Sequence, residues 1–473
     1  MTAARIVAVA LAVVVAASAA VAQQKAELQR EFEAAARALN AGKPDEAEPH
    51  ARAAARLSPD FVAARSMLAV TLEKLGKTEE ARAEFDATEQ LLAGATDPPI
   101  LFTTGLQFAS VGQYERAARL FERVDKLTPD TFEVLYNLGV VYYNLNRYDD
   151  ATRVLAVAAD RNPEPPEPHF RLGLIASERG DSDNAIAEFR HAADRAPKVA
   201  EYQFFLGREY AKTGFWDGAA EAYGKAADID PKEVRFVLAL GTAQLNRRDF
   251  LSATRAFEKA LALDAATPNI QYMIGYCYRA QAMFEQARPY LERQLAAAPD
   301  HVDALASLGF IDLEQGDIAS AETLLKRVLA LDPNNVQALF DMGRVYGKQR
   351  DYEKAIAMMD QCVHVKPDHT QAHYQLYIFY TRTQQKERAD EQLAEFRRLE
   401  ELDKPLESAE VVDTILDLVG PLEVQPETRA ALVDFADHVG EISFGSDEAR
   451  EQSAEKVGRL LRLTVASREY QFA

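Results

Sequence analysis

The stretch 132–165 reads FEVLYNLGVVYYNLNRYDDATRVLAVAADRNPEP and contains the pattern that decides the fold. Its apolar residues recur at three- to four-residue spacing in two runs, which predicts two short amphipathic helices. Gly139 in the first run and Ala151 in the second lack bulk, so the two backbones can approach closely where the helices cross. Pro163 has no amide hydrogen and ends the second helix. The stretch is therefore predicted to form an antiparallel helix pair.

The same pattern repeats along most of the chain with a period of 34 residues. Eight glycines share this spacing: Gly105, Gly139, Gly173, Gly207, Gly241, Gly275, Gly309 and Gly343. An alanine follows each glycine after twelve residues, and the alanine series continues to Ala47, Ala81 and Ala389, so eleven units share one register. A further Gly often separates the two helices of a unit, at Gly42, Gly76, Gly112, Gly180, Gly214 and Gly316. Self-similarity at this period predicts a solenoid of stacked repeats.

The order of residues resembles the tetratricopeptide repeat family, with Leu138, Gly139, Tyr142, Ala151 and Pro163 at its characteristic positions. The resemblance implies an all-α fold: a right-handed superhelical α-solenoid of about eleven 34-residue helix-turn-helix repeats with a C-terminal helical cap. The solenoid is expected over residues 28–403. Its repeats are expected to start near residues 28, 62, 98, 132, 166, 200, 234, 268, 302, 336 and 370.

Some units depart from the pattern. Ala35, Ala69 and Tyr377 replace the glycine, and two extra residues near Asp97 break the spacing once. Each departure weakens the boundary of one repeat and leaves the overall repeat pattern intact. We expect the solenoid to continue through the insertion.

Both ends of the chain differ in composition from the repeats. Residues 1–22 contain Arg5, an uninterrupted apolar run and small residues before Gln23, which predicts a cleaved signal peptide. The alternative is an uncleaved membrane anchor. Residues 404–473 leave the repeat register, and we expect helices over 408–419, 427–439 and 447–467 that cap the last repeat or form a small helical domain.

Charge and motifs exclude several functions. The formal net charge of −20 argues against binding to nucleic acid or to anionic lipid, which would require clustered Lys and Arg. No phosphate-binding glycine loop and no His-Glu-x-x-His motif occurs in the sequence. We therefore expect no enzymatic activity and no cofactor.

The two cysteines and the histidine cluster suggest no site. Cys277 and Cys362 lie in different units, so a disulfide is not expected. Cys362, His364, His369 and His373 fall within twelve residues, but two of them occupy core positions and two flank a surface turn. Their side chains are expected to diverge, so no metal site is predicted.

The resemblance implies that the first helices line a concave groove, with the fifth residue of each unit pointing into it. Eight of the eleven residues there are aromatic: Phe32, Phe102, Tyr136, Phe170, Phe204, Tyr272, Phe340 and Tyr374. Other candidate groove residues, at the ninth, twelfth and thirteenth positions, are Tyr143, Arg208, Lys212, Arg279, Arg344, Lys348 and Arg382. The rings could serve packing between repeats or ligand contact, and the basic residues could form an ordinary solvated face.

These observations predict an exported, periplasmic or secreted scaffold without catalytic activity, which binds a protein or peptide partner in its groove. The aromatic rings and basic side chains suit an acidic, extended segment. Neither nucleic acid nor stable membrane insertion after signal cleavage is expected. One alternative is a glycan-binding protein that uses the aromatic groove. A second is an accessory subunit that docks an enzyme through its C-terminal helices.

Overall fold

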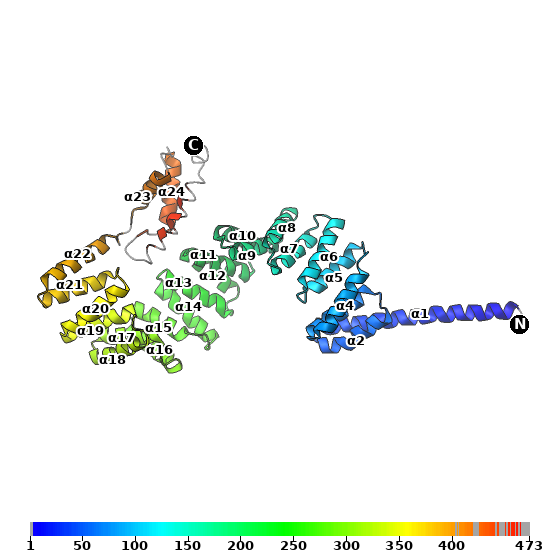
Figure 1. Ribbon diagram of the computed structural model, residues 1–473, viewed down its shortest axis with the longest axis horizontal. Coiled ribbons are helices and arrows are strands. Elements are labelled where there is room, and N and C mark those ends of the chain that lie inside the picture. Colours follow the sequence, from blue (N-terminus) through cyan, green and yellow to red (C-terminus); the bar gives the residue numbers. More distant parts are fainter. Residues whose placement is uncertain are drawn as a thin grey trace. The chain divides into compact units, whose positions relative to one another are not determined.

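The computed structural model describes residues 3–402, 404, 406–419, 425–439 and 442–443, and then 450, 453–454, 456–458, 460–461 and 464, with side chains described from residue 22. These residues are helical apart from turns and one isolated antiparallel bridge between Leu406 and Ile442 (Figure 1). The chain divides into two compact units, unit 1 (Met1–Pro197) and unit 2 (Lys198–Ala473). The predicted all-α fold of packed helix pairs is confirmed.

Unit 1 contains the first ten helices, and consecutive helices within its repeats pack against each other. At the two-residue insertion near Asp97, α3 contacts α5. The helices are α1 (Ala3–Asn40), α2 (Pro44–Leu57), α3 (Val62–Lys74), α4 (Thr78–Leu91), α5 (Pro98–Ala109), α6 (Tyr114–Leu127), α7 (Phe132–Asn144), α8 (Tyr148–Arg161), α9 (Glu167–Glu178) and α10 (Ser182–Arg195).

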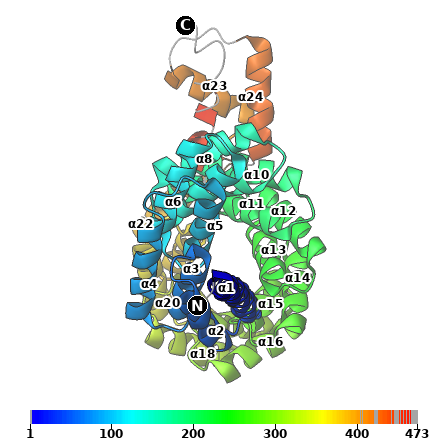
Figure 2. The same cartoon turned by 90° about the vertical axis from the view of Figure 1, so that its right-hand side faces the viewer.

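Unit 2 continues with the same helix pairs, followed by α23 and α24 outside the repeat register. Its helices are α11 (Ala200–Lys212), α12 (Trp216–Ile229), α13 (Val234–Asn246), α14 (Phe250–Leu263), α15 (Ile270–Ala280), α16 (Phe284–Ala297), α17 (Val302–Gln315), α18 (Ile318–Leu331), α19 (Val336–Gln349), α20 (Tyr352–Val365), α21 (Thr370–Arg382), α22 (Lys386–Leu402), α23 (Ser408–Val419) and α24 (Pro426–Val439). In Figure 2, α11, α13 and α15 lie on the inner side of unit 2, while α12, α14 and α16 lie outside them.

The small residues of the repeat are required where the two helices of a pair cross. A Cβ atom added to Gly207 would lie 2.7 Å from Cδ1 of Tyr223, and one added to Gly309 would lie 2.9 Å from Cγ of Leu325. Both separations are far below van der Waals contact. The alanines of the ladder are buried as well, with Ala151 and Ala321 fully shielded from solvent. A Cβ atom added to Gly105 in unit 1 would likewise lie 2.6 Å from Cε1 of Phe121, so the close approach expected from the sequence is present in both units.

The turn between the two helices of each repeat needs a left-handed backbone. The six turn glycines have positive φ angles, between 69° and 85°. In the other five repeats a residue with a side chain adopts the same conformation: Asn146, Arg248, Ala282, Arg350 and Gln384. The following helix often begins with an aspartate cap, as where Asp249 accepts a hydrogen bond from the amide of Ser252 at 3.1 Å. Glycine is thus the frequent, but not the obligatory, residue of this turn.

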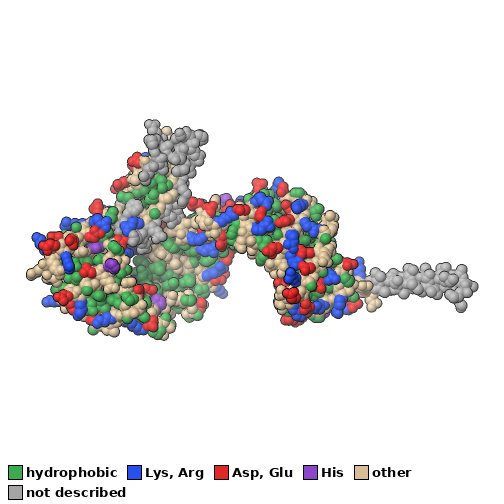
Figure 3. Space-filling model, in the orientation of Figure 1, with side chains coloured by type: hydrophobic (Ala, Val, Ile, Leu, Met, Phe, Trp, Pro, Cys, Tyr) green, Lys and Arg blue, Asp and Glu red, His purple; other side chains and the backbone are tan. Residues whose placement is uncertain are grey.

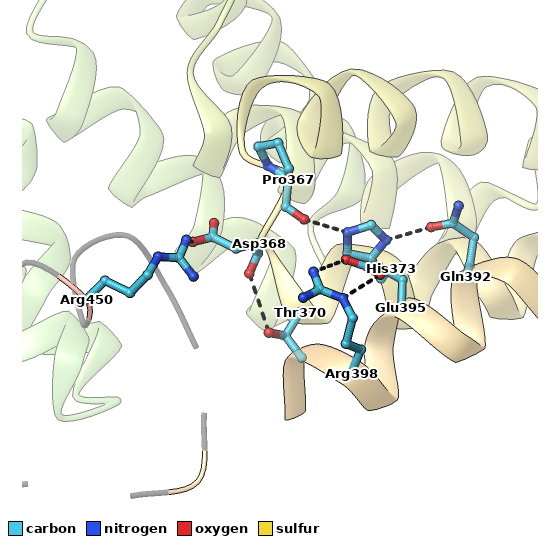
Figure 4. A network of polar contacts seen from close by, with 8 residues as sticks. All are labelled: Pro367, Asp368, Thr370, His373, Gln392, Glu395, Arg398 and Arg450. Carbon is cyan, nitrogen blue, oxygen red and sulfur yellow. Dashed lines mark hydrogen bonds and ion pairs between the residues drawn. The ribbon is translucent and has the colours of Figure 1, made fainter. Parts of the chain in front are cut away.

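The C-terminal segment has a small apolar core of its own. Helix α23 has the predicted bounds, and α24 begins one residue before the predicted 427. Most of the predicted helix over 447–467 lies outside the described residues, although the described positions there are helical. The core consists of Val411, Val412, Ile415, Leu432, Ala436, Ile442 and Leu460. Arg450 joins this segment to the turn before α21 through an ion pair with Asp368 at 3.5 Å (Figure 4).

Helix α1 is described from Ala3 and continues to Asn40, through the predicted cleavage point before Gln23. The side chains of residues 1–21, which make up nearly all of the predicted signal segment, lie outside the described part. In the part that is described, no helix combines the length and the apolar character needed to cross a membrane. Export remains a prediction.

Candidate functional site

The first helices of the last four repeats of unit 2 line a hollowed surface. It consists of two cavities of about 590 Å³ and 380 Å³ that share Arg279 and Gln337. Helices α15 and α17 contact each other, as do α17 and α19, and form its floor. We call this surface the unit 2 groove. Its lining is Tyr272, Tyr276, Arg279, Asp303, Ala306, Ser307, Phe310, Asn335, Val336, Gln337, Phe340, Arg344, His369, Gln371, Tyr374, Gln375 and Phe396.

Aromatic rings and arginines alternate along this groove. The guanidinium carbon of Arg279 lies 4.9 Å from the ring centre of Tyr276 and 5.0 Å from that of Phe310. The guanidinium carbon of Arg344 lies 6.0 Å from Phe310 and 5.9 Å from Phe340. These distances are within the range of cation–π attraction. We call Tyr276, Arg279, Phe310, Arg344 and Phe340 the ring–arginine ladder.

The ladder is extended at one end by a histidine from the turn before α21. The ring of His369 stacks on Phe340 with centroids 4.8 Å apart. Burial lowers the pKa of His369, so this imidazole is neutral near pH 7. Beyond it, Tyr374 is 42% exposed and lies 5.1 Å from Phe396. In Figure 3, hydrophobic and histidine side chains gather on the visible face of unit 2, at the left.

The charge of Arg344 is already balanced within the protein. Arg344 donates hydrogen bonds to Glu314 at 2.6 Å and to Asp341 at 3.0 Å. Asp341 is fully buried and also accepts a hydrogen bond from Gln337 at 2.7 Å. Burial raises the pKa of Asp341 despite these contacts, while the two carboxylates raise the pKa of Arg344 against the effect of its own burial. Arg344 therefore contributes little net attraction for an acidic ligand.

Arg279 differs because rings hold its guanidinium in place. Its Nε is buried and has no hydrogen-bond partner among the described residues. Because that atom is buried, the terminal nitrogens of the guanidinium are the donors that a ligand carboxylate can reach from the groove. Between the rings of Tyr276 and Phe310 the groove therefore presents the cation of Arg279, and the same cavity is also lined by Gln337, Gln371 and Gln375.

Five of the predicted ligand residues lie together in this groove: Tyr272, Arg279, Phe340, Arg344 and Tyr374. Two further predicted residues lie outside its lining. Lys348 donates a hydrogen bond to the carbonyl of Leu313 at 3.2 Å, and Arg382 is exposed at the end of α21. The basic side chains of these repeats thus do not form one free positive surface.

The predicted residues on α11 are engaged in packing. Phe204 packs against Tyr223 and Phe236 with ring centroids 5.5 Å and 5.2 Å away. Arg208 lies over Phe205 at 4.2 Å. Lys212 donates a hydrogen bond to the buried Glu209 at 3.2 Å.

The predicted residues of unit 1 also contact neighbouring rings. Tyr136 stacks on Phe132 at 6.2 Å. Phe170 lies 5.7 Å from Phe189, and Tyr143 lies 5.9 Å from Tyr148. Tyr143 is also within 6.0 Å of the guanidinium of Arg171. These rings belong to the internal packing of unit 1.

Several groove residues were missed from the sequence. Tyr276 and Phe310 occupy the ninth position of their repeats, the same position as Arg344. A search of that position for rings as well as for basic residues would have found both. His369 comes from a turn and Phe396 from the second helix of the last repeat, where the family pattern implies no groove residue.

The residues considered for a metal cluster occupy different surroundings. Cys362 is buried, which raises the pKa of its thiol to about 12. The ring nitrogens of His373 contact Gln392 and the carbonyl of Pro367 at 2.6 Å and 2.9 Å. His364 is exposed, and His369 stacks in the groove as described above. Each side chain therefore has a separate role.

Two family models, both described as tetratricopeptide repeat, match the chain. One matches residues 38–93, 109–176 and 312–376, and the other matches 170–234, 238–301 and 272–336. Between 38 and 376 only 94–108 and 235–237 fall outside these segments. The longer gap contains the insertion near Asp97. No curated relative matches the chain at a significant level.

Solved structures similar to parts of the chain are also repeat proteins. A MamA crystal structure is 26% identical over 36% of this chain and 92% of its own, with a TM-score of 0.34. YrrB, titled a TPR protein with an unusual peptide-binding site, is 18% identical over 39% of this chain and 95% of its own, with a TM-score of 0.35. The C-terminal part of a repeat protein from Cytophaga hutchinsonii is 21% identical over 51% of this chain and 99% of its own, with a TM-score of 0.42.

Proposed function

The chain belongs to the tetratricopeptide repeat family, and from this premise we propose that it is a non-catalytic scaffold that binds a protein partner in the unit 2 groove. Members of this family bind protein or peptide partners. Both matching family models describe repeats, and neither describes a catalytic domain. The observation that carries the proposal is Arg279, a cation that is held between Tyr276 and Phe310 and lines both cavities of the groove.

The ligand that fits this arrangement is an extended peptide segment with apolar side chains and one acidic residue. The exposed ring of Tyr374 and the partly buried rings of Tyr276 and Phe310 offer apolar contact at low cost in side-chain entropy. The amides of Gln337, Gln371 and Gln375 can pair with the backbone groups of an extended chain. One carboxylate suffices, because Arg344 is already paired with Glu314 and Asp341.

We further propose that the protein acts outside the cytoplasm. The basis is the sequence of residues 1–22, with Arg5, an apolar run and small residues before Gln23. N-terminal sequencing of the protein from its native host tests this directly. A mature chain that begins at Gln23 is expected, and an intact chain from Met1 in the cytosol would reject export.

Two other functions share some of these features. Aromatic rings beside amide side chains also suit a glycan, which would stack on the rings and need no carboxylate. The separate apolar core of the C-terminal segment suits an accessory subunit that docks an enzyme. Both alternatives predict that Arg279 is dispensable for peptide binding.

The test is a selection of random short peptides displayed on phage against the full-length chain. The selected peptides are then measured against the Arg279→Ala and Arg208→Ala variants. Arg208 is the matched control because it also lies over a phenylalanine ring, Phe205 at 4.2 Å, but outside the groove. We expect peptides that contain Asp or Glu, with Kd raised about tenfold by Arg279→Ala, or about 1.4 kcal/mol, and unchanged by Arg208→Ala.

Peptides that bind the Arg279→Ala variant as tightly as the parent would contradict the proposal. Failure to select peptides, together with binding of oligosaccharides to the same protein, would favour the glycan function. Peptide binding that depends on residues of α23 and α24 would favour docking through the C-terminal segment.

A further inference from the structure

A second cluster of chemically reactive side chains lies in unit 1, on the pair α9 and α10. His169 is on α9, and Glu188 and His191 are on α10. One ligand atom from each of the three lies within 4.8 Å of the other two, and no other such group of three occurs among the residues described. Nδ1 of His169 lies 2.7 Å from Oε2 of Glu188, and the ring centres of the two histidines are 5.2 Å apart.

The repeat architecture explains how two of these residues meet. His169 occupies the fourth position of its repeat and Glu188 the twenty-third. The same two positions are in contact in other repeats: Glu31 with His50 at 2.6 Å and Arg65 with Glu84 at 2.8 Å. A polar pair at these positions is therefore a structural contact between the two helices of a repeat and needs no metal.

The third residue makes this repeat different. His191 follows Glu188 by three residues, which places both on one face of α10. At the position of His191, the repeats that contain the Glu31–His50 and Arg65–Glu84 contacts have Ala53 and Ala87. A helical Glu-x-x-His pair combined with a ligand from a neighbouring helix is an arrangement that carboxylate-bridged metal proteins also use.

The last repeat shows the same positions without a metal-binding set (Figure 4). His373 and Gln392 are in contact at 2.6 Å, and the other ring nitrogen of His373 contacts the carbonyl of Pro367. Glu395, at the position of His191, is paired with Arg398 at 2.5 Å. The amide of Gln392 is neutral and the carboxylate of Glu395 is already paired with Arg398, so both are weak ligands for a metal ion. In unit 1 the same three positions supply two imidazoles and a carboxylate.

We propose that His169, Glu188 and His191 bind a divalent transition metal ion, with Zn²⁺ as the best match. Two imidazole nitrogens and one carboxylate oxygen are ligands that Zn²⁺ prefers, at about 2.0–2.2 Å each, and tetrahedral geometry then places ligand atoms about 3.3 Å apart. Nδ1 of His169 and Oε2 of Glu188, now 2.7 Å apart as a hydrogen-bonded pair, have to separate slightly to reach this spacing. His191 is exposed, so its ring can turn toward the other two without disturbing the core.

Three protein ligands leave one position of a tetrahedral site open. The site is at the surface, since the side chain of Glu188 is 27% exposed and His191 is exposed. The fourth ligand is therefore water or a side chain from a bound partner. The metal ion replaces the hydrogen bond between His169 and Glu188 and links α9 to α10, so metal binding also stabilises this repeat.

The experiment titrates Zn²⁺ into the full-length chain by isothermal calorimetry, with the absorption spectrum of bound Co²⁺ as a second readout. We expect one tight site in the parent. His191→Ala is the decisive variant because it removes a ligand but keeps the contact between His169 and Glu188. It should weaken Zn²⁺ binding at least about tenfold and abolish the rise in melting temperature that Zn²⁺ causes.

Two variants serve as controls. His50→Ala removes a histidine of a matched pair that lacks the third ligand, and His364→Ala removes an exposed histidine elsewhere. Both should bind Zn²⁺ like the parent. Glu188→Gln should weaken binding while it keeps a side chain that can contact His169. Absence of Zn²⁺ binding by the parent, or equal affinity of the parent and His191→Ala, would overturn the proposal.

Discussion

The inner faces of the two units use aromatic residues at the same repeat position in different ways. In unit 1, Tyr136 and Phe170 pack against neighbouring rings, Phe132 and Phe189. In unit 2, Phe204 packs against Tyr223 and Phe236 in the same way, but Phe340 is one wall of a cavity of about 590 Å³ and lies beside an arginine and a histidine. An aromatic residue at the fifth position therefore does not by itself identify a binding surface.

The residue at the ninth position accounts for the difference. In unit 1 this position is aliphatic, as in Leu106, Val140 and Leu174. In unit 2 it is Tyr276, Phe310 and Arg344 in three successive repeats, and these side chains build the ring–arginine ladder. Large side chains at two positions per helix, with a cation between them, leave a lined hollow at the surface.

The largest expected change in stability tests the glycines at the helix crossings, which both units share. Gly105→Leu in unit 1 and Gly207→Leu in unit 2 place a branched side chain where a Cβ atom alone would lie 2.6 Å from Phe121 and 2.7 Å from Tyr223. Each should lower the free energy of unfolding by roughly 1–3 kcal/mol, as measured by urea denaturation.

Gly224→Ala is the control for these variants. The glycine is within α12, and its added Cβ would meet only Leu240, at 3.9 Å. This substitution should stabilise the protein by roughly 0.5–1 kcal/mol because alanine favours helix. If all three variants unfold alike, close helix crossing is not the role of the glycine ladder.

The next prediction concerns peptide affinity and tests the aromatic ring at the ninth repeat position. Phe310→Leu introduces the residue of Leu106 and Leu174 and removes one ring beside Arg279. Binding of the selected acidic peptides should weaken about fivefold, or about 1 kcal/mol, through the lost cation–π and stacking contacts. The control variant Tyr136→Leu removes a ring from the fifth position of a unit 1 repeat and should leave binding unchanged in the same fluorescence-anisotropy assay. Equal losses in both variants would remove the distinction between the two faces.

The repeat fold could be predicted because one small residue recurs where two helices cross. Gly207 meets Tyr223 in the structure for the reason its spacing suggests. The division after Pro197 could not be predicted, since the spacing of 34 residues from Gly173 to Gly207 passes over it unchanged. The periodic pattern reports contacts within a repeat, and it says little about how repeats group.

The site was only partly predictable. Arg344 was expected to attract an acidic ligand, but Glu314 and Asp341 from α17 and α19 compensate it. Such pairing depends on side-chain geometry across two repeats, which spacing alone does not reveal. Conversely, the stronger candidate Arg279 is distinguished by its contacts with the rings of Tyr276 and Phe310, which the spacing of the repeats does not predict.

A smaller effect concerns the buried carboxylate beneath the ladder. One repeat of unit 1 has asparagine at the position of Asp341, at Asn137, so Asp341→Asn introduces a residue that the repeat accepts elsewhere. Burial raises the pKa of Asp341 in the folded protein. The folded state then binds a proton more tightly than the unfolded state, so the contribution of Asp341 to stability is fully present below about pH 4 and is lost as pH rises through the folded pKa.

The parent should therefore gain stability relative to Asp341→Asn as the pH falls from 7 toward 4, by about 1.4 kcal/mol for each unit by which the pKa is raised. Urea denaturation of both proteins at several pH values measures the difference. A difference that is constant with pH, or that shrinks on acidification, would show that the ion pair with Arg344 outweighs the effect of burial.

The smallest effect concerns the turns, where the two units differ in sequence but not in backbone. Four of the five turns in unit 1 have glycine, while Ala282 in unit 2 adopts a φ of 57° with a side chain. A left-handed backbone costs a residue with a Cβ atom about 1 kcal/mol relative to glycine. Ala282→Gly should therefore stabilise the protein by up to about 1 kcal/mol, although glycine also increases the entropy of the unfolded chain.

Gly180→Ala in unit 1 is the reverse exchange at φ 75°, where the added Cβ meets no atom within 4 Å, so only backbone strain is measured. Its destabilisation should be of similar size and opposite sign by urea denaturation. If instead both exchanges leave stability unchanged, the left-handed turn costs these residues nothing, and the glycines of unit 1 have no conformational advantage over the side chains that replace them in unit 2.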